Sequence, residues 1–206
     1  MPPRSSPRSE VAAARLLVAR HGQSEWNAVG RWQGQADVPL SDEGMRQAAD
    51  AGLQLGTFDA VWSSDLGRAA LTASIIAEII GIGPVMLDAR LRETDVGPWQ
   101  GLTHHEVEAG WPGYLEHHRR PEGFEDYDDA AHRMIAAFVD IAAASPGGEV
   151  LVISHGGAIR AVRRLLGCHD ARLPNLGGSW FTVHDTAVTP GDVVHLTDAE
   201  PTGMAL

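Results

Sequence analysis

Short apolar runs alternate with longer amphipathic segments along most of the chain, which predicts alternating strands and helices. Polar and glycine residues punctuate this pattern. Ser41 is a good helix N-cap, and Gly56, Gly81 and Gly167 suit helix ends. The predicted strands are 16–19, 60–63, 85–87, 150–153, 180–183 and 193–196, and the predicted helices are 42–55, 69–80, 127–144 and 158–166.

This order of elements is typical of a three-layer α/β/α fold, in which a mostly parallel sheet carries helices on both faces and has at least one antiparallel edge strand. The last two strands are expected to form a closing hairpin joined through Pro190 and Gly191. In the first helix, the positions expected to be buried are Ala48, Ala49, Leu53 and Leu55.

Three segments lack a clear period: two expected long loops, 27–40 and 90–102, and a lid-like insertion at about 103–126. Long loops in compact domains are more often functional than short ones. Residues 15–206 are predicted to form a single domain. Residues 1–14 are expected to be a disordered tail, because the N-terminus is rich in Pro, Ser and Arg and lacks the apolar run of a secretory signal.

Composition and charge narrow the range of partners. The chain has 206 residues, 44% of them hydrophobic, which is ordinary for a soluble globular protein. Its 16 Lys and Arg against 27 Asp and Glu give a net charge of −11, which disfavours nucleic acid and anionic membranes. The single cysteine, Cys168, excludes an internal disulfide, is consistent with a cytoplasmic location and is expected to be a small buried filler. No window approaches the ~18 apolar residues of a membrane span.

Histidines directly follow two of the predicted strands. Arg20-His21-Gly22 comes after the first strand, and Ser154-His155-Gly156-Gly157 comes after the strand at 150–153. Parallel strands present their carboxyl ends at one edge of a sheet, where ligands of open α/β sheets bind, so the two histidines are expected to lie side by side. Taken alone, the first stretch leaves two interpretations open. His21 is a nucleophile for an anionic centre such as phosphorus, or it only hydrogen-bonds a turn.

Two arginines and a carboxylate complete a candidate pocket for a tetrahedral dianion. Arg20 and Arg68 can bind phosphate oxygens bidentately, and their charge persists at any working pH. A neutral histidine is a competent nucleophile, and a second one can donate to phosphoryl oxygens. The glycines after each histidine, Gly156 among them, let other groups approach the backbone closely. The leaving group needs an acid, for which Glu93 on the loop after the third strand is the candidate.

Four motifs, taken in order, resemble those of the histidine phosphatase superfamily, branch 1, which includes the cofactor-dependent phosphoglycerate mutases. They lie at 20–27 (RHGQSEWN), 63–69 (SSDLGRA), 91–93 (LRE) and 154–157 (SHGG). The similarity covers about 16–183, most of the chain. It implies a phosphoglycerate mutase-like fold and chemistry through a phosphohistidine, with no metal and no cofactor. The implied partner is a small phosphorylated substrate, and a homodimer stays open as an assembly state.

The resemblance also implies roles for single residues. The catalytic set is His21, Glu93, His155, Arg20 and Arg68, and the substrate-binding set is Asn27, Ser24, Gln33, Gly34 and Gly156. Within the first set, His21 would form the phosphohistidine. Glu93 would donate a proton to the leaving group and then act as the base for water.

The segment after Glu93 favours a phosphatase over a mutase. In the mutases this glutamate precedes a Tyr-Gly-x-Leu-x-Gly-Leu-Asn-Lys pattern, whereas residues 94–103 here read TDVGPWQGLT and lack the Asn-Lys pair. Residues 32–35, 90–94 and 99–104 resemble the phosphatase subgroup that includes the glucosyl-3-phosphoglycerate phosphatases. We therefore expect hydrolysis of small phosphomonoesters of the sugar phosphate or phosphoglycerate type. The alternatives are a phosphoglycerate mutase and a catalytically silent phosphoester-binding module, the latter disfavoured because no catalytic position is substituted.

Histidine and arginine clusters in the insertion have ordinary interpretations as well. The pairs His104-His105 and His117-His118 do not complete a metal site, because no Cys or carboxylate spacing supplies the remaining ligands. The run His118-Arg119-Arg120 is either a solvated face or a site for a second substrate anion.

Aromatic and acidic residues near the predicted loops are expected to be structural. The tryptophans of these loops, Trp26, Trp32 and Trp99, should pack under the loops rather than frame the pocket entrance. The acidic residues Glu122, Glu125 and Asp126 are expected to charge the start of the long helix.

Overall fold

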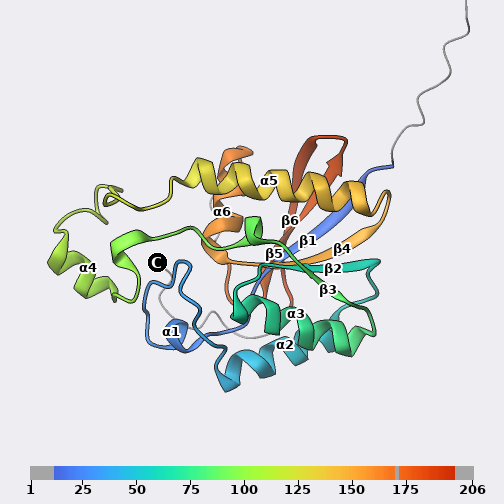
Figure 1. Cartoon of the computed structure of the whole chain (residues 1–206), viewed down its shortest axis with the longest axis horizontal. Coiled ribbons are helices and arrows are strands. Elements are labelled where there is room, and N and C mark those ends of the chain that lie inside the picture. Colours follow the sequence, from blue (N-terminus) through green and yellow to red (C-terminus); the bar gives the residue numbers. More distant parts are fainter. Residues whose placement is uncertain (1–11, 170–171, 198–206) are drawn as a thin grey trace, which may run out of the picture.

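The computed structural model describes residues 12–169 and 172–197, and Figure 1 shows a six-stranded sheet between layers of helices. The strands are β1 (Ala14–Arg20), β2 (Ala60–Ser63), β3 (Val85–Leu87), β4 (Glu149–Ser154), β5 (Gly177–His184) and β6 (Ala187–His195). The α-helices are α1 (Glu25–Ala28), α2 (Asp42–Gln54), α3 (Gly67–Ile80), α4 (His104–Gly110), α5 (Tyr127–Ala144) and α6 (Gly156–Leu165). Two 3-10 turns, Ala89–Leu91 and Gly97–Trp99, lie between β3 and α4.

The strand order in the sheet is β3-β2-β4-β1-β5-β6. Strands β3, β2, β4 and β1 pair in parallel, whereas β5 runs antiparallel to β1 and β6 runs antiparallel to β5. Helices α5 and α6 cover one face, and α2 and α3 cover the other (Figure 1). The predicted three-layer fold, with a mostly parallel sheet and an antiparallel edge, is confirmed.

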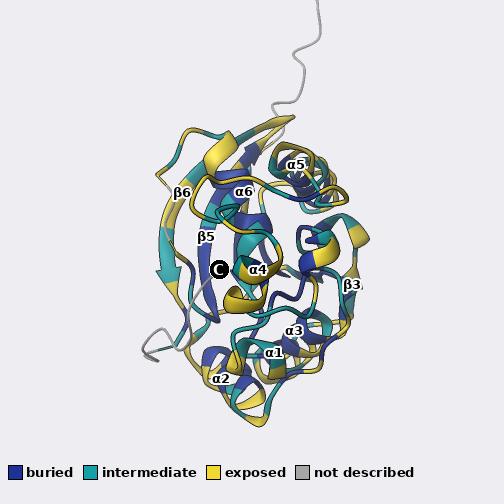
Figure 2. Cartoon of the chain, turned by 90° about the vertical axis from the view of Figure 1, so that its left-hand side faces the viewer, coloured by how far each residue is buried: buried dark blue, intermediate teal, exposed yellow. Residues whose placement is uncertain are grey.

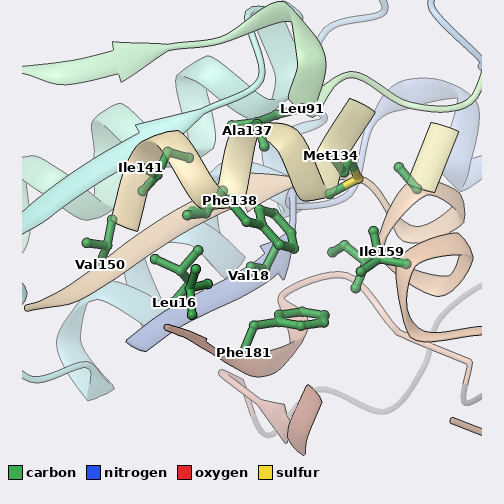
Figure 3. Close-up of a cluster of buried hydrophobic side chains, with 14 of the residues drawn as sticks. Leu16, Val18, Leu91, Met134, Ala137, Phe138, Ile141, Val150, Ile159 and Phe181 are labelled. Carbon is green, nitrogen blue, oxygen red and sulfur yellow. The ribbon is translucent and has the colours of Figure 1, made fainter. Parts of the chain in front are cut away.

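The central strands are buried on both faces, so alternate residues of each strand enter two different cores. In β1, Leu16 and Val18 pack with Phe138 of α5 (Figure 3). The residues between and after them, Leu17 and Ala19, belong to the core beneath α2 and α3. This two-sided burial is why the central strands read as continuous apolar runs rather than alternating ones.

The register of the parallel strands brings three strand ends to one level. Arg20 at the end of β1 lies opposite Ser154 of β4, and Ser63 of β2 lies opposite Ile153. The N–H of His21 continues the ladder by donating to the Ser154 carbonyl at 3.0 Å. The segments that follow β1, β2 and β4 therefore leave the sheet side by side at its carboxyl edge.

The start of the folded chain differs from the expected tail at 1–14. Residues 1–11 lie outside the described residues, but the carbonyl of Ala12 already accepts the N–H of Gly147 at 3.1 Å. Ala14 opens β1, is buried and pairs with Val183. The expectation was wrong for 12–14 because Ala14 packs in the core beneath α5, a tertiary contact that local composition does not reveal.

Helix α2 buries small residues and exposes one predicted core residue. Leu53 is 76% exposed, and Ala49 and Leu55 are only partly buried. The buried residues of α2 are Gly44, Gln47, Ala48, Ala51 and Gly52. A Cβ on Gly52 would lie 3.0 Å from the Ile79 side chain of α3, so the two helices approach too closely for a larger residue. That close contact turns Leu53 outward.

The closing hairpin forms, but its turn was predicted in the wrong place. The turn contains Asp185, with φ of 53°, and Pro190 and Gly191 lie inside β6. Pairing is irregular there, with a register shift between Ser179 and Phe181 of β5. Strand β6 is the outermost strand and has no fully buried residue (Figure 2). Proline is tolerated on such an edge because its missing N–H interrupts no inner ladder.

Several helix ends follow their capping residues. Helix α5 has its predicted bounds and begins after Asp126, whose carboxylate accepts the Asp128 N–H at 2.7 Å. Helix α3 ends at Gly81, which adopts φ of 73°. After α6, Cys168 is half-buried rather than buried as expected. Across 12–169 and 172–197, no helix combines the length and apolar composition that a membrane span requires.

The insertion packs on an aromatic cluster beneath the loops. Its helix α4 is capped by Thr103, and Val107 of α4 is buried with Trp32 and Trp99. The ring centroids of these two tryptophans lie 5.2 Å apart. Packing under the loops is therefore confirmed for this pair, although Trp32 also lines the cavity described below.

We expect Phe138→Ala to lower the free energy of unfolding by about 3–5 kcal/mol, because it empties a fully buried position whose ring centroid lies 5.1 Å from that of Phe181. Urea unfolding curves measure this change. The control is Leu53→Ala, which should stay within about 0.5 kcal/mol of wild type. Equal losses in the two variants would contradict the assignment of Phe138 to the core and Leu53 to the surface.

Candidate active site

A cavity that opens to solvent lies at the carboxyl edge of the parallel strands. Most of the residues predicted to act on substrate line it: Arg20, His21, Asn27, Gln33, Gly34, Arg68, Glu93 and Gly156. Two predicted residues, Ser24 and His155, are fully buried and do not line it. The loop at 27–40, the turn before α3 and the start of α6 therefore contribute to one site, as their positions after separate strands predict.

The ring of His21 is held in one neutral form. Its Nδ1 lies 2.6 Å from the carbonyl oxygen of Gly22, which can only accept, so Nδ1 carries the proton. Its Nε2 accepts a hydrogen bond from Nε of Arg68 at 3.1 Å, so the lone pair is on Nε2. Burial, together with the charges of Arg68 and Arg20, lowers the pKa of His21 well below its ordinary value of 6.5. The imidazole is therefore neutral at neutral pH, as a nucleophile must be.

Glycine contacts fix the loop that carries His21. A Cβ on Gly22 would lie 2.5 Å from the carbonyl oxygen of Gly44, and a Cβ on Gly44 would lie 1.9 Å from that of Gln23. Helix α2 thus starts directly against the backbone after His21. The amide of Asn175 adds a hydrogen bond to the His21 carbonyl at 3.0 Å. The sequence analysis missed Gly44 and Asn175, which follow no strand and belong to no quoted motif.

The guanidinium groups of buried Arg68 and partly buried Arg20 donate to loop carbonyls. Arg68, in the first turn of α3, donates to the carbonyls of Ala36 at 2.6 Å and Gly34 at 2.8 Å. Arg20 donates to the carbonyl of Leu173 at 2.9 Å. Burial lowers the pKa of each guanidinium to about 10, so both remain charged at neutral pH. The segment at 33–36 folds over the site because its carbonyls solvate Arg68.

His155 lies beside His21 at the start of α6. The two ring centroids are 5.1 Å apart, and Nε2 of His155 lies 2.9 Å from the Ser64 hydroxyl. Nδ1 of His155 is buried and has no hydrogen-bond partner among the described residues. Burial first, and then the charge of Arg68, lowers the pKa of His155 well below its ordinary value, so this ring is also neutral. The Ser64 hydroxyl can donate to Nε2 or accept from it, depending on the tautomer. In the tautomer in which Ser64 donates, Nδ1 carries the ring proton and can donate to a bound ligand.

Glu93 reaches the site from the loop after β3 and is held by the start of α6. Its carboxylate accepts the N–H groups of Thr94 at 2.8 Å, Gly157 at 3.0 Å and Ala158 at 2.8 Å. A Cβ on Gly157 would lie 2.7 Å from Oε1 of Glu93. Glycine at this position therefore admits the carboxylate, in agreement with the close approach that the sequence predicted.

Asn27 presents its amide nitrogen to the cavity because its oxygen is already bonded. Oδ1 accepts the N–H of Ser24 and the amide of Asn175, each at 3.3 Å. The Ser24 hydroxyl donates to Oε1 of Gln33 at 2.7 Å. Ser24, predicted to line the rim, instead caps α1 and orients the two amides that do line it.

Comparison with known proteins decides the family. Residues 16–193 match the model of the histidine phosphatase superfamily, branch 1. The chain belongs to this superfamily. A glucosyl-3-phosphoglycerate phosphatase of Mycolicibacterium vanbaalenii is 39% identical over 197 residues, covering 86% of this chain and 87% of that protein. The probable phosphoglycerate mutase GpmB of Klebsiella pneumoniae is 34% identical over 204 residues, covering 88% of this chain and 94% of that protein.

Solved structures agree with this placement in the histidine phosphatase superfamily. The structure of a mycobacterial glucosyl-3-phosphoglycerate phosphatase complexed with VO3 has a TM-score of 0.76 and 32% identity, covering 88% of this chain and 98% of that one. The protein is thus a phosphomonoester hydrolase of the superfamily, and the phosphatase relatives support that activity more strongly than the mutase relatives support theirs.

Of the two interpretations of the run at 118–120, the solvated face holds for His118 and Arg119, which are exposed, whereas Arg120 is partly buried. The run His118-Arg119-Arg120 does not line the cavity, and Arg120 instead bonds the Tyr127 hydroxyl and lies 5.3 Å from the centroid of the Trp99 ring. Three further cations line the cavity and were not predicted from the sequence: Arg31, Arg160 and Arg172. Among the described residues, no three His, Cys, Asp or Glu side chains gather as a metal site would require.

Glu125 does more than charge the start of α5. Its carboxylate, just before α5, pairs with Arg133 within the helix, with Nε to Oε1 at 2.7 Å. Both side chains are about one fifth exposed. The sequence analysis missed this pair because Arg133 lies in a helix, far from every strand end.

We expect the free energy of unfolding to fall as the pH drops below about 6.5. In that range the unfolded chain binds protons at His21 and His155 that the folded enzyme excludes, and each histidine should cost roughly 1 kcal/mol by pH 5.5. Urea unfolding at pH 7.5 and 5.5 measures the loss. His21→Asn and His155→Asn should each reduce it, and an unchanged pH dependence in both variants would contradict the exclusion of protons from these rings.

Proposed function

We propose that this histidine phosphatase hydrolyses small phosphomonoesters through a phosphohistidine formed on Nε2 of His21. The observation that carries the proposal is the neutral His21 ring, whose Nε2 lone pair meets the buried guanidinium of Arg68. A phosphoryl group entering the cavity would replace that contact, with its oxygen accepting from Arg68 and its phosphorus facing Nε2. Nδ1 keeps its proton, and its hydrogen bond to the Gly22 carbonyl, throughout.

In the first step the bond from His21 Nε2 to phosphorus forms as the ester P–O bond breaks. Glu93 gives a proton to the departing alkoxide oxygen. A carboxylate has about four acceptor positions, and three N–H groups occupy three of them, which leaves one for that proton. In the second step Glu93 takes a proton from water, the water oxygen bonds to phosphorus, and the P–N bond breaks to release phosphate.

Charge on the phosphoryl oxygens is balanced by groups that need little rearrangement. Arg20 and Arg68 carry the positive charge, and burial strengthens their attraction for the dianion. The Nδ1–H of His155, the amide of Asn27 and the start of α6 at Gly156 add neutral donors. The single cysteine fits a reducing compartment, and we propose the cytoplasm as the location.

His21→Ala should lower kcat/KM for any phosphomonoester by about 10⁴-fold or more, because no other side chain can form the covalent intermediate. Rapid acid-free quenching with a ³²P-labelled substrate should trap a phosphoenzyme in the wild type that is acid-labile and base-stable, and the variant should show none. Arg46→Met, an exposed change on α2, serves as the control. Retained turnover in pure His21→Ala protein would refute the nucleophile.

The substrate we propose carries a second anionic group, such as a carboxylate, beyond its phosphate. Arg31, Arg160 and Arg172 line the same cavity, although the chain as a whole has a net charge of −11. Cations concentrated in one cleft of an acidic protein attract an anionic ligand there. The names of the phosphatase relatives, which specify glucosyl-3-phosphoglycerate, support a phosphoglycerate ester as the first candidate.

In a phosphate-release assay, glucosyl-3-phosphoglycerate and 3-phosphoglycerate should have lower KM values than glucose phosphates of similar size. Arg160→Met should raise KM for the carboxylated substrates about 10-fold while changing KM for p-nitrophenyl phosphate little, since a lost charge-assisted contact is worth roughly 1.5–3 kcal/mol. Equal changes for both substrates would contradict a role in binding the second anion. With 2,3-bisphosphoglycerate as primer, free phosphate rather than 2-phosphoglycerate should be the product, which separates the phosphatase from a mutase.

A further inference from the structure

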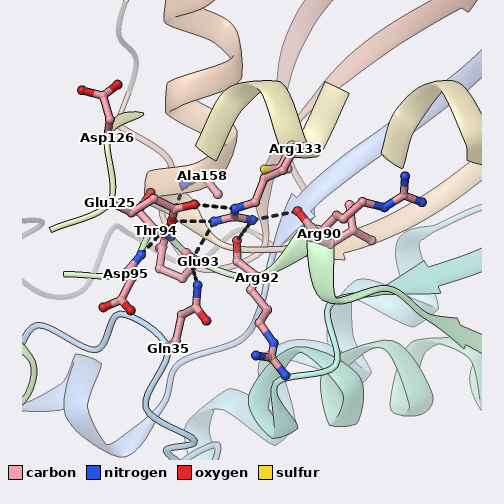
Figure 4. A network of polar contacts seen from close by, with 12 residues as sticks. Gln35, Arg90, Arg92, Glu93, Thr94, Asp95, Glu125, Asp126, Arg133 and Ala158 are labelled. Atoms are coloured by element: carbon pink, nitrogen blue, oxygen red, sulfur yellow. Dashed lines mark hydrogen bonds and ion pairs between the residues drawn. The ribbon is translucent and has the colours of Figure 1, made fainter. Parts of the chain in front are cut away.

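The salt bridge between Glu125 and Arg133 holds the loop that carries Glu93 against α5 (Figure 4). Glu125 stands just before α5, and Arg133 lies two turns into it. The two side chains pair bidentately: Nε of Arg133 donates to Oε1 of Glu125 at 2.7 Å, and Nη2 donates to Oε2 at 2.9 Å. A paired guanidinium of this kind has a fixed plane and direction.

The remaining N–H groups of that guanidinium point at main-chain carbonyls of the same loop. Nη1 of Arg133 donates to the carbonyls of Arg90 and Arg92, each at 2.7 Å, and Nη2 donates to the carbonyl of Glu93 at 3.0 Å. A guanidinium has five N–H donors. All five of Arg133 are therefore used, two on Glu125 and three on the backbone around Glu93.

The carboxylate of Glu125 secures the other side of the same loop. Its Oε2 accepts the N–H of Asp95 at 2.9 Å, and the Glu125 N–H donates to the Asp95 carbonyl at 2.8 Å. The loop is thus held on both sides of Glu93, by Arg133 before it and by Glu125 after it. The Glu93 side chain itself is held separately, by the N–H groups at the start of α6.

We propose that Arg133 and Glu125 are positioning residues for the proton donor, and this inference rests on the proposed role of Glu93. Neither side chain lines the cavity, so neither binds substrate directly. Their contacts set where the Glu93 main chain lies relative to α6, and hence how far its carboxylate reaches toward the leaving oxygen. Proton transfer requires hydrogen-bond distance, and a misplacement of about 1 Å can cost orders of magnitude in rate.

Other ion pairs of the loop lack this link to the Glu93 backbone. Arg90 pairs through its side chain with Asp88 and with the exposed Asp140 of α5, and Arg92 pairs with Asp65. None of these pairs donates to the carbonyl of Glu93. The Arg90–Asp140 pair joins the same helix to the same loop, so Asp140→Asn is a matched control for the loss of a salt bridge there.

The test exploits the leaving group, because proton donation matters for a poor leaving group and little for an activated one. We compare kcat/KM for 3-phosphoglycerate, an alkyl ester, and for p-nitrophenyl phosphate, since this parameter reports formation of the phosphohistidine. Arg133→Lys retains the charge but cannot make five directed bonds, and Glu125→Gln retains the size but loses the charge. Each should lose about 10-fold more activity on the alkyl ester than on the aryl ester.

Glu93→Gln supplies the reference and separates two ways of failing. It should show the same selectivity for the aryl ester, and adding Arg133→Lys to it should cause no further selective loss. Asp140→Asn should lower kcat/KM only slightly, and to the same extent on both substrates. A selective loss in Glu93→Gln with an equal loss on both esters in Arg133→Lys and Glu125→Gln would overturn the positioning role alone. No selectivity in Glu93→Gln would overturn the proton donor, and the positioning role with it.

Discussion

The active site depends on the need to hydrogen-bond two guanidinium groups beside the neutral His21 ring, those of buried Arg68 and partly buried Arg20. A buried charge is costly unless hydrogen bonds replace its hydration. Arg68 obtains those bonds from the carbonyls of Gly34 and Ala36, and Arg20 obtains one from Leu173. Loops distant in sequence are thereby drawn to one place. Burial, and then the same charges, keep His21 unprotonated, so the groups that attract a phosphate dianion also help to maintain the nucleophile that attacks it.

The fold and the central residues could be predicted because both follow from strand ends. The apolar runs of β1 and β4 locate His21 and His155, since a parallel sheet buried on both faces leaves polar chemistry only at its carboxyl edge. Glu93 and Arg68 follow other strands by the same rule. No comparable local signal marks Asn175, which reaches His21 from the segment before β5.

The residues whose roles could not be predicted from the sequence act through contacts between helices and loops that are far apart along the chain. Gly44 reads as an ordinary helical residue until α2 is placed against Gln23, and Leu53 reads as a core residue until small residues bring α2 onto α3. Arg133 sits in an amphipathic helix, where a solvated arginine is the ordinary expectation. Its role emerges only when the loop after β3 folds beneath α5 and offers three carbonyls to its guanidinium.

The two edge strands of the sheet determine whether another copy of this enzyme could add a strand to it. An exposed, regular edge strand is a template onto which another chain can add, and natural sheets blunt such edges with short strands, bulges or proline. Here β3 has three residues, and β6 carries Pro190 beside a register irregularity. Both ends of the sheet are therefore poor templates for strand addition. Pro190, where the hairpin turn was predicted, instead removes one N–H donor from the outer strand and so disfavours growth of a continuous sheet from this edge.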